Sequence, residues 1–269
     1  MTCWHKGGDL NDYEQRNLLH WLLDPTPDPR HLWVTERPIA HRGWFDVSQG
    51  IPENSMAAFQ RALDHQYHME LDVRLLADGQ PVVFHDHDLE RMTGERGLVA
   101  NLTTAQWRKL RLRHDHHPPP LLREVFELTA DKGGILVELK DPSPRAAQAV
   151  VTAAAGHRGP WAALSFHAGI ISWFARHHPH ITRGLNGGVF EQEVSPLASW
   201  EMRTFLHAPG ARPHFLGCYL HSLNNPLPRW LRFRGLPIIA WTARSAEDWH
   251  RTRHIRDAMI FEGNVPRPP

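Results

Sequence analysis

Short apolar runs alternate with longer amphipathic stretches along the chain from residue 38 onward. The runs are too short for helices, and polar or turn-forming residues bound them, which is typical of buried strands. They are residues 39–41, 69–73, 135–139, 162–166, 182–186, 215–220, 237–242 and 258–261. The clearest helical stretches between them are residues 54–65, 145–155, 169–177 and 246–255. Because parallel strands are joined by helical crossovers, this alternation predicts a parallel sheet.

Eight strand–helix units within about 230 residues match the size of a (β/α)8 barrel. We therefore expect an α/β fold of the TIM-barrel type over residues 38–269. Residues 1–37 are expected to form an N-terminal extension, with a helix over 11–23 that a proline-rich stretch ends. Residues 86–120 are long, polar and rich in Arg and His, and they interrupt the alternation. We expect them to have a functional role, since long loops at a barrel mouth are usually functional.

Two carboxylates, Glu70 and Asp72, stand two residues apart in the expected strand 69–73. Residues at this spacing point to the same face of a strand, so their charges lie side by side. This arrangement is unfavourable unless a cation or a proton lies between them. The neighbours Met69, Leu71 and Val73 place the other face in a core, which argues against a solvated strand edge. The pair therefore predicts a cation site.

An Asp-Gly pair at residues 78–79 predicts a tight hairpin that follows this strand. The returning arm would be residues 82–85, antiparallel to the strand before it. A two-residue turn pairs residues 77 and 80, and this register places Asp72 opposite His85 and Glu70 opposite His87. Directly opposed side chains share a face. The hairpin is thus expected to bring an imidazole to the carboxylates.

Further polar residues stand at the carboxyl ends of the expected strands, where a barrel carries its active site. Glu138 would be a third carboxylate, and three carboxylates suit one Mg²⁺ or Ca²⁺, whereas zinc ligand spacings are missing. Arg42 and Lys140 are placed to meet an anion, phosphate in particular. His41 and His85 can serve as base and acid on opposite sides of a substrate. Together these residues predict phosphoryl-ester chemistry assisted by a divalent cation.

Some of these positions also have simpler explanations. Glu138 and Lys140 could form a structural ion pair on one strand face. Trp241 ends a strand and is expected to line the substrate, although it could belong to the core. Glu53 and Asn54 begin a helix, where Asn54 or Ser55 could be a cap; the alternative is that both Glu53 and Asn54 support the metal site.

The composition excludes several classes of function. Thirty Lys and Arg balance 29 Asp and Glu, so nothing favours a nucleic-acid partner. Two cysteines do not make a disulfide scaffold, and no apolar run approaches a membrane span. These features predict a soluble, cytoplasmic protein with no integral membrane contact, and the phosphoryl-ester chemistry predicted above implies a small-molecule substrate. A homo-oligomeric state is left open.

Ordered motifs along the chain resemble those of glycerophosphodiester phosphodiesterases, which are PLC-like phosphodiesterase TIM barrels. The resemblance is dense up to residue 94 and thinner afterward. It implies a metal-dependent hydrolase that releases sn-glycerol 3-phosphate and an alcohol, and it implies that residues 86–120 are a small cap insertion over the active site. The motifs are HRG at 41–43, PENS at 52–55, ELDV at 70–73, DGQPVVFHD at 78–86 and ELK at 138–140.

The resemblance also implies roles for individual residues and leaves alternatives open. The last strand departs from the family pattern, which usually ends in a Thr-Asp or similar pair before a proline. Here residues 261–266 read FEGNVP, so the role of Glu262 is open. One alternative function is a lysophospholipase D acting on lysophospholipids; another is a non-catalytic barrel that binds phosphate esters. The implied residues are His41 and His85 for catalysis, Glu70, Asp72 and Glu138 for the metal, and Arg42 and Lys140 for phosphate.

Overall fold

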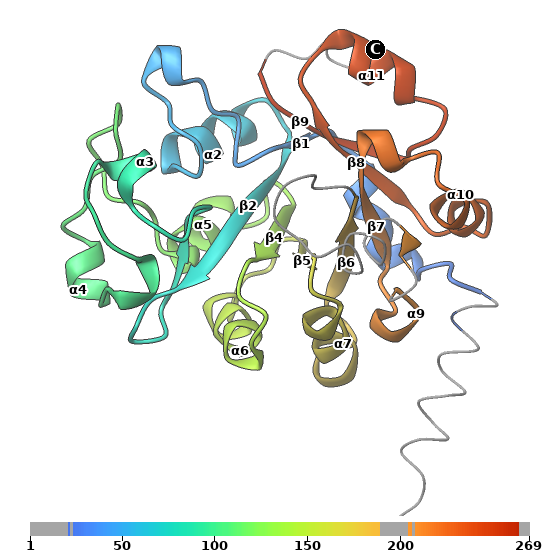
Figure 1. The fold of residues 1–269 in the computed structure, drawn as a ribbon, viewed down its shortest axis with the longest axis horizontal. Coiled ribbons are helices and arrows are strands. Elements are labelled where there is room, and N and C mark those ends of the chain that lie inside the picture. The colour runs from blue at the N-terminus through green and yellow to red at the C-terminus, as the bar shows by residue number, and fades with distance from the viewer. Residues whose placement is uncertain (1–20, 22–23, 189–203, 206–207, 264–269) are drawn as a thin grey trace, which may run out of the picture.

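A closed barrel of parallel strands forms the centre of the molecule (Figure 1). The computed structural model describes residue 21 and residues 24–188, 204–205 and 208–263. The first strand pairs with both the second and the last, which closes the barrel. Within the described residues, each of the eight expected runs corresponds to a barrel strand, so the TIM-barrel prediction is confirmed. The strands are β1 Ile39–Ala40, β2 His68–Leu75, β4 Ile135–Leu139, β5 Trp161–Ser165, β6 Thr182–Gly187, β7 Phe215–Tyr219, β8 Ile238–Ala243 and β9 Ala258–Phe261.

Helices surround the barrel and connect its strands (Figure 1). Several begin at a serine whose hydroxyl accepts a backbone N–H of the first turn, as Ser55, Ser143 and Ser245 do. The α-helices are α2 Met56–Asp64, α3 Glu90–Thr93, α4 Thr104–Trp107, α5 Leu122–Thr129, α6 Pro144–Ala153, α7 Ala168–His177, α9 Ala208–Ala211, α10 Pro226–Phe233 and α11 Ala246–Thr252. The 3-10 helices are η1 Pro29–Thr35, η2 Val47–Gln49, η3 Val99–Asn101 and η4 Leu220–Ser222.

The strands separate two apolar regions, one inside the barrel and one between the barrel and its helices. On β4, Leu136 packs inside, whereas Ile135, Val137 and Leu139 pack toward the helices. Because strand side chains alternate, Glu138 continues the inward row of Leu136. The period-two pattern thus carries a carboxylate to the inside of the barrel, near the carboxyl end of the strand.

The hairpin after β2 exists, but its register differs by one residue from the expected register. The returning strand β3 Pro81–Val83 pairs Arg74 with Val82, and the Phe84 N–H donates to the Asp72 carbonyl at 2.9 Å. The loop has three residues, 77–79, because Gly79 has a φ of +84° and adds a bulge to the turn. The expected pairing of Asp72 with His85 is therefore wrong.

Residues 86–120 contain α3, η3 and α4 and have an apolar cluster of their own. Trp107 is fully buried there, packs edge-on against Phe84 and donates its indole N–H to the Pro119 carbonyl at 2.9 Å. This insertion is thus a packed unit beside the hairpin. The helix expected over residues 11–23 lies almost entirely outside the described residues.

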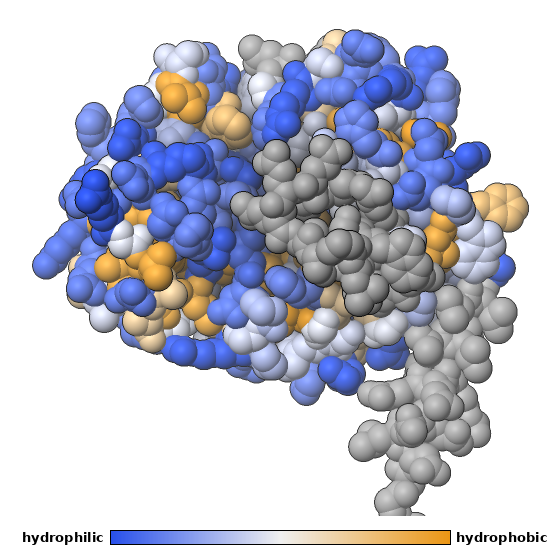
Figure 2. Space-filling model, in the orientation of Figure 1, coloured by the Kyte–Doolittle hydropathy of each residue, from blue (hydrophilic) through white to orange (hydrophobic). Residues whose placement is uncertain are grey.

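The visible surface of the described part is mainly hydrophilic, with apolar residues in small separate groups (Figure 2). Among the described residues, no helix is both long enough and apolar enough to cross a membrane.

A buried histidine at the start of β2 makes the stability of the barrel depend on pH. His68 accepts the Gly134 N–H at Nδ1 (2.9 Å), and its Nε2 lies 3.0 Å from the Trp33 carbonyl. A ring that accepts at one nitrogen must be neutral, and burial, with a smaller effect of Arg37, lowers the pKa of His68 to about 4. In the unfolded chain His68 therefore binds a proton as the pH falls through about 6.5, whereas in the folded chain it binds one only as the pH approaches about 4.

The contribution of His68 is present above pH 6.5 and is lost as the pH falls toward 4. Between pH 7 and pH 5, the wild type is expected to lose on the order of 2 kcal/mol more unfolding free energy than His68→Gln, whose neutral side chain keeps a donor and an acceptor. Urea unfolding at both pH values measures this difference. The exposed His250→Gln should behave as the wild type, and equal losses in all three proteins would contradict the assignment.

Candidate functional site

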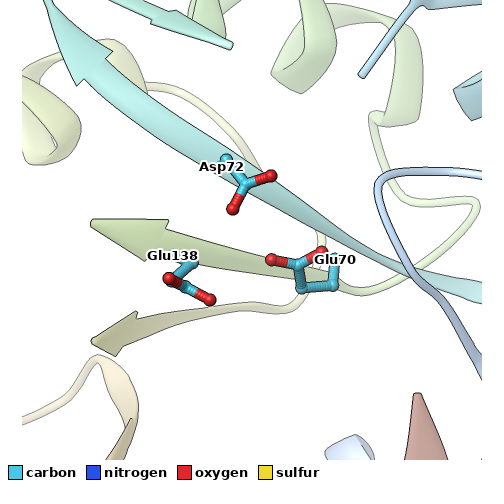
Figure 3. A group of neighbouring side chains, drawn as sticks. All are labelled: Glu70, Asp72 and Glu138. Atoms are coloured by element: carbon cyan, nitrogen blue, oxygen red, sulfur yellow. The ribbon is translucent and has the colours of Figure 1, made fainter. Parts of the chain in front are cut away.

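Three carboxylates from adjacent strands meet inside the barrel (Figure 3). Glu70 and Asp72 come from β2 and Glu138 from β4, and β2 and β4 pair so that Asp72 stands beside Glu138. One oxygen of each lies within 4.8 Å of the others. The three side chains are buried, with residue exposures of 1%, 1% and 7%. These are the three expected metal ligands, brought together by the fold.

The electrostatics of this cluster suit a divalent cation. Burial, and then repulsion from Asp72 and Glu138, raises the pKa of Glu70 well above its ordinary value. Glu70 Oε1 is buried and has no hydrogen-bond partner. An orphaned oxygen beside two further carboxylates offers the hard ligand set that Mg²⁺ and Ca²⁺ require. The residues present therefore fit a divalent metal ion.

Two cations lie directly against the carboxylates. Lys140 Nζ is 2.8 Å from Asp72 Oδ1 and also contacts Glu138. Arg42 Nε is 3.2 Å from Asp72 Oδ2, and its other nitrogen NH1 is 2.7 Å from Glu53 Oε1. Burial opposes ionisation of Asp72, but these cations outweigh it and lower its pKa. The two expected phosphate contacts are thus placed at the site, where they balance part of its charge.

Carboxylates outnumber cations among the ion-paired side chains of the site. Among the described residues of this ion-pair network, five carboxylates face three cations, an excess of two negative charges when Glu70 is ionised and the histidines are neutral. The carboxylates are Glu53, Glu70, Asp72, Asp86 and Glu138, and the cations are Arg42, Arg91 and Lys140. Arg74, which interacts with Asp72, offsets part of this excess.

An unusual backbone at Arg42 allows it to contact the cluster at two points. Its φ is +55°, and its N–H donates to Glu70 Oε2 at 3.1 Å. Gly43 follows with a φ of +77°, and a Cβ there would lie 2.8 Å from the Cβ of Ala58 on α2. Only glycine fits so close to the helix, which explains the third position of the HRG motif. Such strained conformations concentrate at functional sites.

The PENS motif supports the same cluster. Asn54 has a φ of +54°, donates its N–H to the Arg42 carbonyl at 2.8 Å and donates its side-chain amide to Asp72 Oδ2 at 2.9 Å. Of the two expected candidates, Ser55 is the residue that caps α2. Glu53 binds both Arg42 and Arg91. Both residues thus contact groups of the site, as the supporting role requires.

Both expected catalytic histidines lie at the cluster. His41 follows β1, and its Nε2 is 3.8 Å from Glu70 Oε2. His85 follows β3 at a bend over residues 85–87, and Asp72 is the charge that acts on it most strongly. Burial lowers the pKa of His85 despite this carboxylate. The chain leaves strand geometry after Val83, so His85 reaches the site although the expected register was wrong.

Each histidine has a carboxylate on its Nδ1 atom. His41 Nδ1 is 2.6 Å from Glu262 Oε1, and His85 Nδ1 is 2.8 Å from Asp86 Oδ1. Arg91 binds Asp86 at 2.6 Å and connects it to Glu53.

Aromatic rings line the barrel near the last strands. Trp241 on β8 packs edge-on against Phe166, at 5.6 Å between ring centroids, and tilted against Tyr219 at 5.2 Å. Trp241 is partly exposed and packs against the apolar cluster inside the barrel, and its contact with the substrate stays a prediction. The sequence signals for these neighbours are their positions at or just after strand ends.

Three residues of the site carry no role in the sequence-based prediction. Asp86 directly follows His85 and ends the DGQPVVFHD motif, and Arg91 stands five residues further along the chain. Asn186 ends the expected strand 182–186, and its amide donates to Glu138 Oε2 at 3.2 Å. A strand-end position was the available signal for Asn186.

Comparisons with known proteins identify the family of this chain. A model of the glycerophosphoryl diester phosphodiesterase family matches residues 41–261. A glycerophosphodiester phosphodiesterase of Caldanaerobacter subterraneus subsp. tengcongensis is 27% identical over 226 residues, which are 79% of this chain and 88% of that protein. Human glycerophosphodiester phosphodiesterase 1 is 34% identical over 143 residues, 48% of this chain and 42% of its own. The match spans most of the bacterial relative and under half of the human one.

Solved structures share the fold. A glycerophosphodiester phosphodiesterase from Thermotoga maritima has a TM-score of 0.65 at 25% identity, covering 83% of this chain and 92% of its own. An Oleispira antarctica phosphodiesterase, in complex with the product sn-glycerol-3-phosphate, has a TM-score of 0.69 at 23% identity and covers 84% and 92%. The resemblance carried by the motifs is confirmed, because the family model spans most of the chain. The chain belongs to the glycerophosphoryl diester phosphodiesterase family and is an enzyme of that family.

Proposed function

We propose that the protein hydrolyses glycerophosphodiesters to sn-glycerol 3-phosphate and an alcohol, using two histidines and one Mg²⁺ or Ca²⁺. The observation that carries the proposal is the buried set of Glu70, Asp72 and Glu138 with His41 and His85 beside it. The bound product named for the Oleispira relative supports sn-glycerol 3-phosphate as one half of the substrate.

Three carboxylates would hold the cation: Glu70, Asp72 and Glu138. When bound, the cation would polarise the phosphoryl group and offset its charge. Arg42 and Lys140 lie against the carboxylates that would hold the cation. They would therefore be close to a phosphate bound to that cation and would offset the rest of its negative charge. This division of labour leaves proton transfer to the histidines.

One histidine would remove the proton of the nucleophile, and the other would donate a proton to the departing alcohol oxygen as its bond to phosphorus breaks. The nucleophile is either water, which gives sn-glycerol 3-phosphate directly, or the 2-hydroxyl of the glycerol, which gives a cyclic phosphate that water then opens to the same product. His41 and His85 come from separate elements, which allows them to approach the phosphate from two sides. We assign His85 as the acid and His41 as the base.

A coupled assay for glycerol 3-phosphate release tests the proposal. Glycerophosphocholine, glycerophosphoethanolamine and lysophospholipids serve as substrates, first with a chelator and then with added Mg²⁺ or Ca²⁺. We expect release from the glycerophosphodiesters, loss of activity on chelation and recovery with one of the two cations. Lysophospholipids would release choline and lysophosphatidic acid and no glycerol 3-phosphate, so choline release is measured in parallel. Choline release from lysophospholipids alone would favour the lysophospholipase D alternative. Activity that survives chelation would refute the metal assignment.

A further inference from the structure

We infer that Glu262, held by Arg244, is a positioning residue that fixes the ring orientation and tautomer of His41. The inference rests on the proposed role of His41, and it extends to a residue that no motif assigned.

The barrel itself brings Glu262 to His41. β1 and β9 are neighbours, and Ala40 pairs with Phe261, so the residues that follow them lie side by side. The His41 N–H donates to the Phe261 carbonyl at 3.0 Å, and the Glu262 N–H donates to the Ala243 carbonyl at 2.9 Å. Backbone hydrogen bonds therefore hold His41 and Glu262 side by side, although the two residues are 221 positions apart in the sequence.

The contact determines which nitrogen of His41 carries the proton. An ionised carboxylate only accepts hydrogen bonds, so a separation of 2.6 Å from Glu262 Oε1 requires a proton on Nδ1. Burial opposes ionisation of Glu262, but hydrogen bonds from His41 and Arg244 outweigh it and lower its pKa to about 2. In the neutral ring the lone pair then lies on Nε2, the atom that is 3.8 Å from Glu70 Oε2. Nε2 is thus the atom available for proton transfer at the cluster.

Arg244 fixes the carboxylate in turn. Its Nε is 2.8 Å from Glu262 Oε2, the oxygen that His41 does not use. The residue stands just after β8, which pairs with β9, so it reaches Glu262 from the next strand.

The second histidine has the same arrangement from unrelated parts of the chain. Asp86 Oδ1 lies 2.8 Å from Nδ1 of His85, and Arg91 Nε lies 2.6 Å from Asp86 Oδ2. A histidine, a carboxylate and an arginine therefore occur twice at one site. An ion pair with only a structural role would not need to contact Nδ1 of a histidine. Because the same contact occurs at both histidines, it indicates that the carboxylates orient the imidazole rings.

The decisive variant is Glu262→Gln, whose amide has nearly the same shape without the charge. We expect kcat to fall roughly 10- to 100-fold with little change in KM, the size seen when outer partners of functional histidines are removed. Bis(p-nitrophenyl) phosphate serves as a second substrate beside a glycerophosphodiester, so the ratio to wild type does not depend on the natural substrate. Glu247→Gln, an exposed change of the same kind on α11, is the matched control and should keep wild-type kinetics.

A spectroscopic measurement separates positioning from a structural role. In protein labelled with ¹⁵N-histidine, the His41 resonances, identified by their loss in His41→Asn, should show a protonated Nδ1 in the wild type and a shift toward the other tautomer in Glu262→Gln. Arg244→Gln, at a side chain that is 70% exposed, should fold normally and change kcat in the same direction. Unchanged tautomer and kcat, or a rise in KM alone, would overturn the inference. If the wild type cleaved neither substrate, the proposed function would fail, and the NMR result would still decide the role of Glu262.

Discussion

Glu70→Gln is expected to make the metal-free protein more stable while it removes most of the activity. The wild-type carboxylate is buried beside Asp72 and Glu138, and its Oε1 has no partner. A glutamine keeps the oxygen that accepts the Arg42 N–H, and its amide can donate to a neighbouring carboxylate. We expect the unfolding free energy in chelator to rise by on the order of 1–3 kcal/mol. The charge that a cation requires is thus a cost to the fold in its absence.

Urea unfolding with and without added cation measures both halves of this effect. A cation at 100 times its dissociation constant should stabilise the wild type by about 2.7 kcal/mol and should stabilise Glu70→Gln much less. Asp72→Asn is the contrasting variant, because it leaves the buried Arg42 and Lys140 without their shared partner. It should lose about 3–5 kcal/mol of unfolding free energy in chelator. If both variants were destabilised equally, the charge balance described for the site would be wrong.

The strands were predictable because each carries a simple signal of its own. On β2 and β4, apolar residues alternate with inward positions, so Glu70, Asp72 and Glu138 could be placed on one face before any contact was known. In a closed barrel, strands that follow one another in the strand order lie side by side. The cluster of three carboxylates therefore follows from the pattern within each strand and from the order of the strands in the barrel.

The hairpin shows where local signals were insufficient. An Asp-Gly pair suits both a two-residue turn and a three-residue turn with a bulge at glycine, and these differ by one residue in register. The structure adopts the second, with Gly79 in the left-handed region. His85 reaches the cluster because the chain bends after Val83, and no strand pattern encodes that bend.

Contacts between side chains across the barrel also could not be predicted from the sequence. Asn186 meets Glu138 across the intervening strand β5, because alternate strands of a barrel fill the same interior layer. Gly217 on β7 makes room for this amide, since a Cβ there would lie 1.9 Å from Asn186 Oδ1. Such fits depend on three strands at once. His68 was hidden for another reason: with 21 histidines in the chain, a single one carries little information.

Removal of either catalytic histidine is expected to cause the largest loss of turnover. His41→Ala and His85→Ala should each lower kcat by about 10²- to 10⁴-fold, the contribution of a positioned general acid or base. KM should change little, because Arg42, Lys140 and the carboxylates remain to bind the phosphate. His87→Ala, at an exposed neighbouring side chain, is the matched control and should keep wild-type turnover. Near wild-type turnover in both catalytic variants would refute the mechanism.

The leaving group distinguishes the acid from the base. An alcohol such as choline needs a proton as it departs, whereas p-nitrophenolate leaves without one, so loss of the acid should matter far less for a p-nitrophenyl ester. With His85 as the acid, His85→Ala should recover most of its relative rate on that ester, and His41→Ala should remain slow on both substrates. Recovery by His41→Ala instead would reverse the assignment. Glu262 would then be the carboxylate partner of the acid, His41, and Asp86 the carboxylate partner of the base, His85.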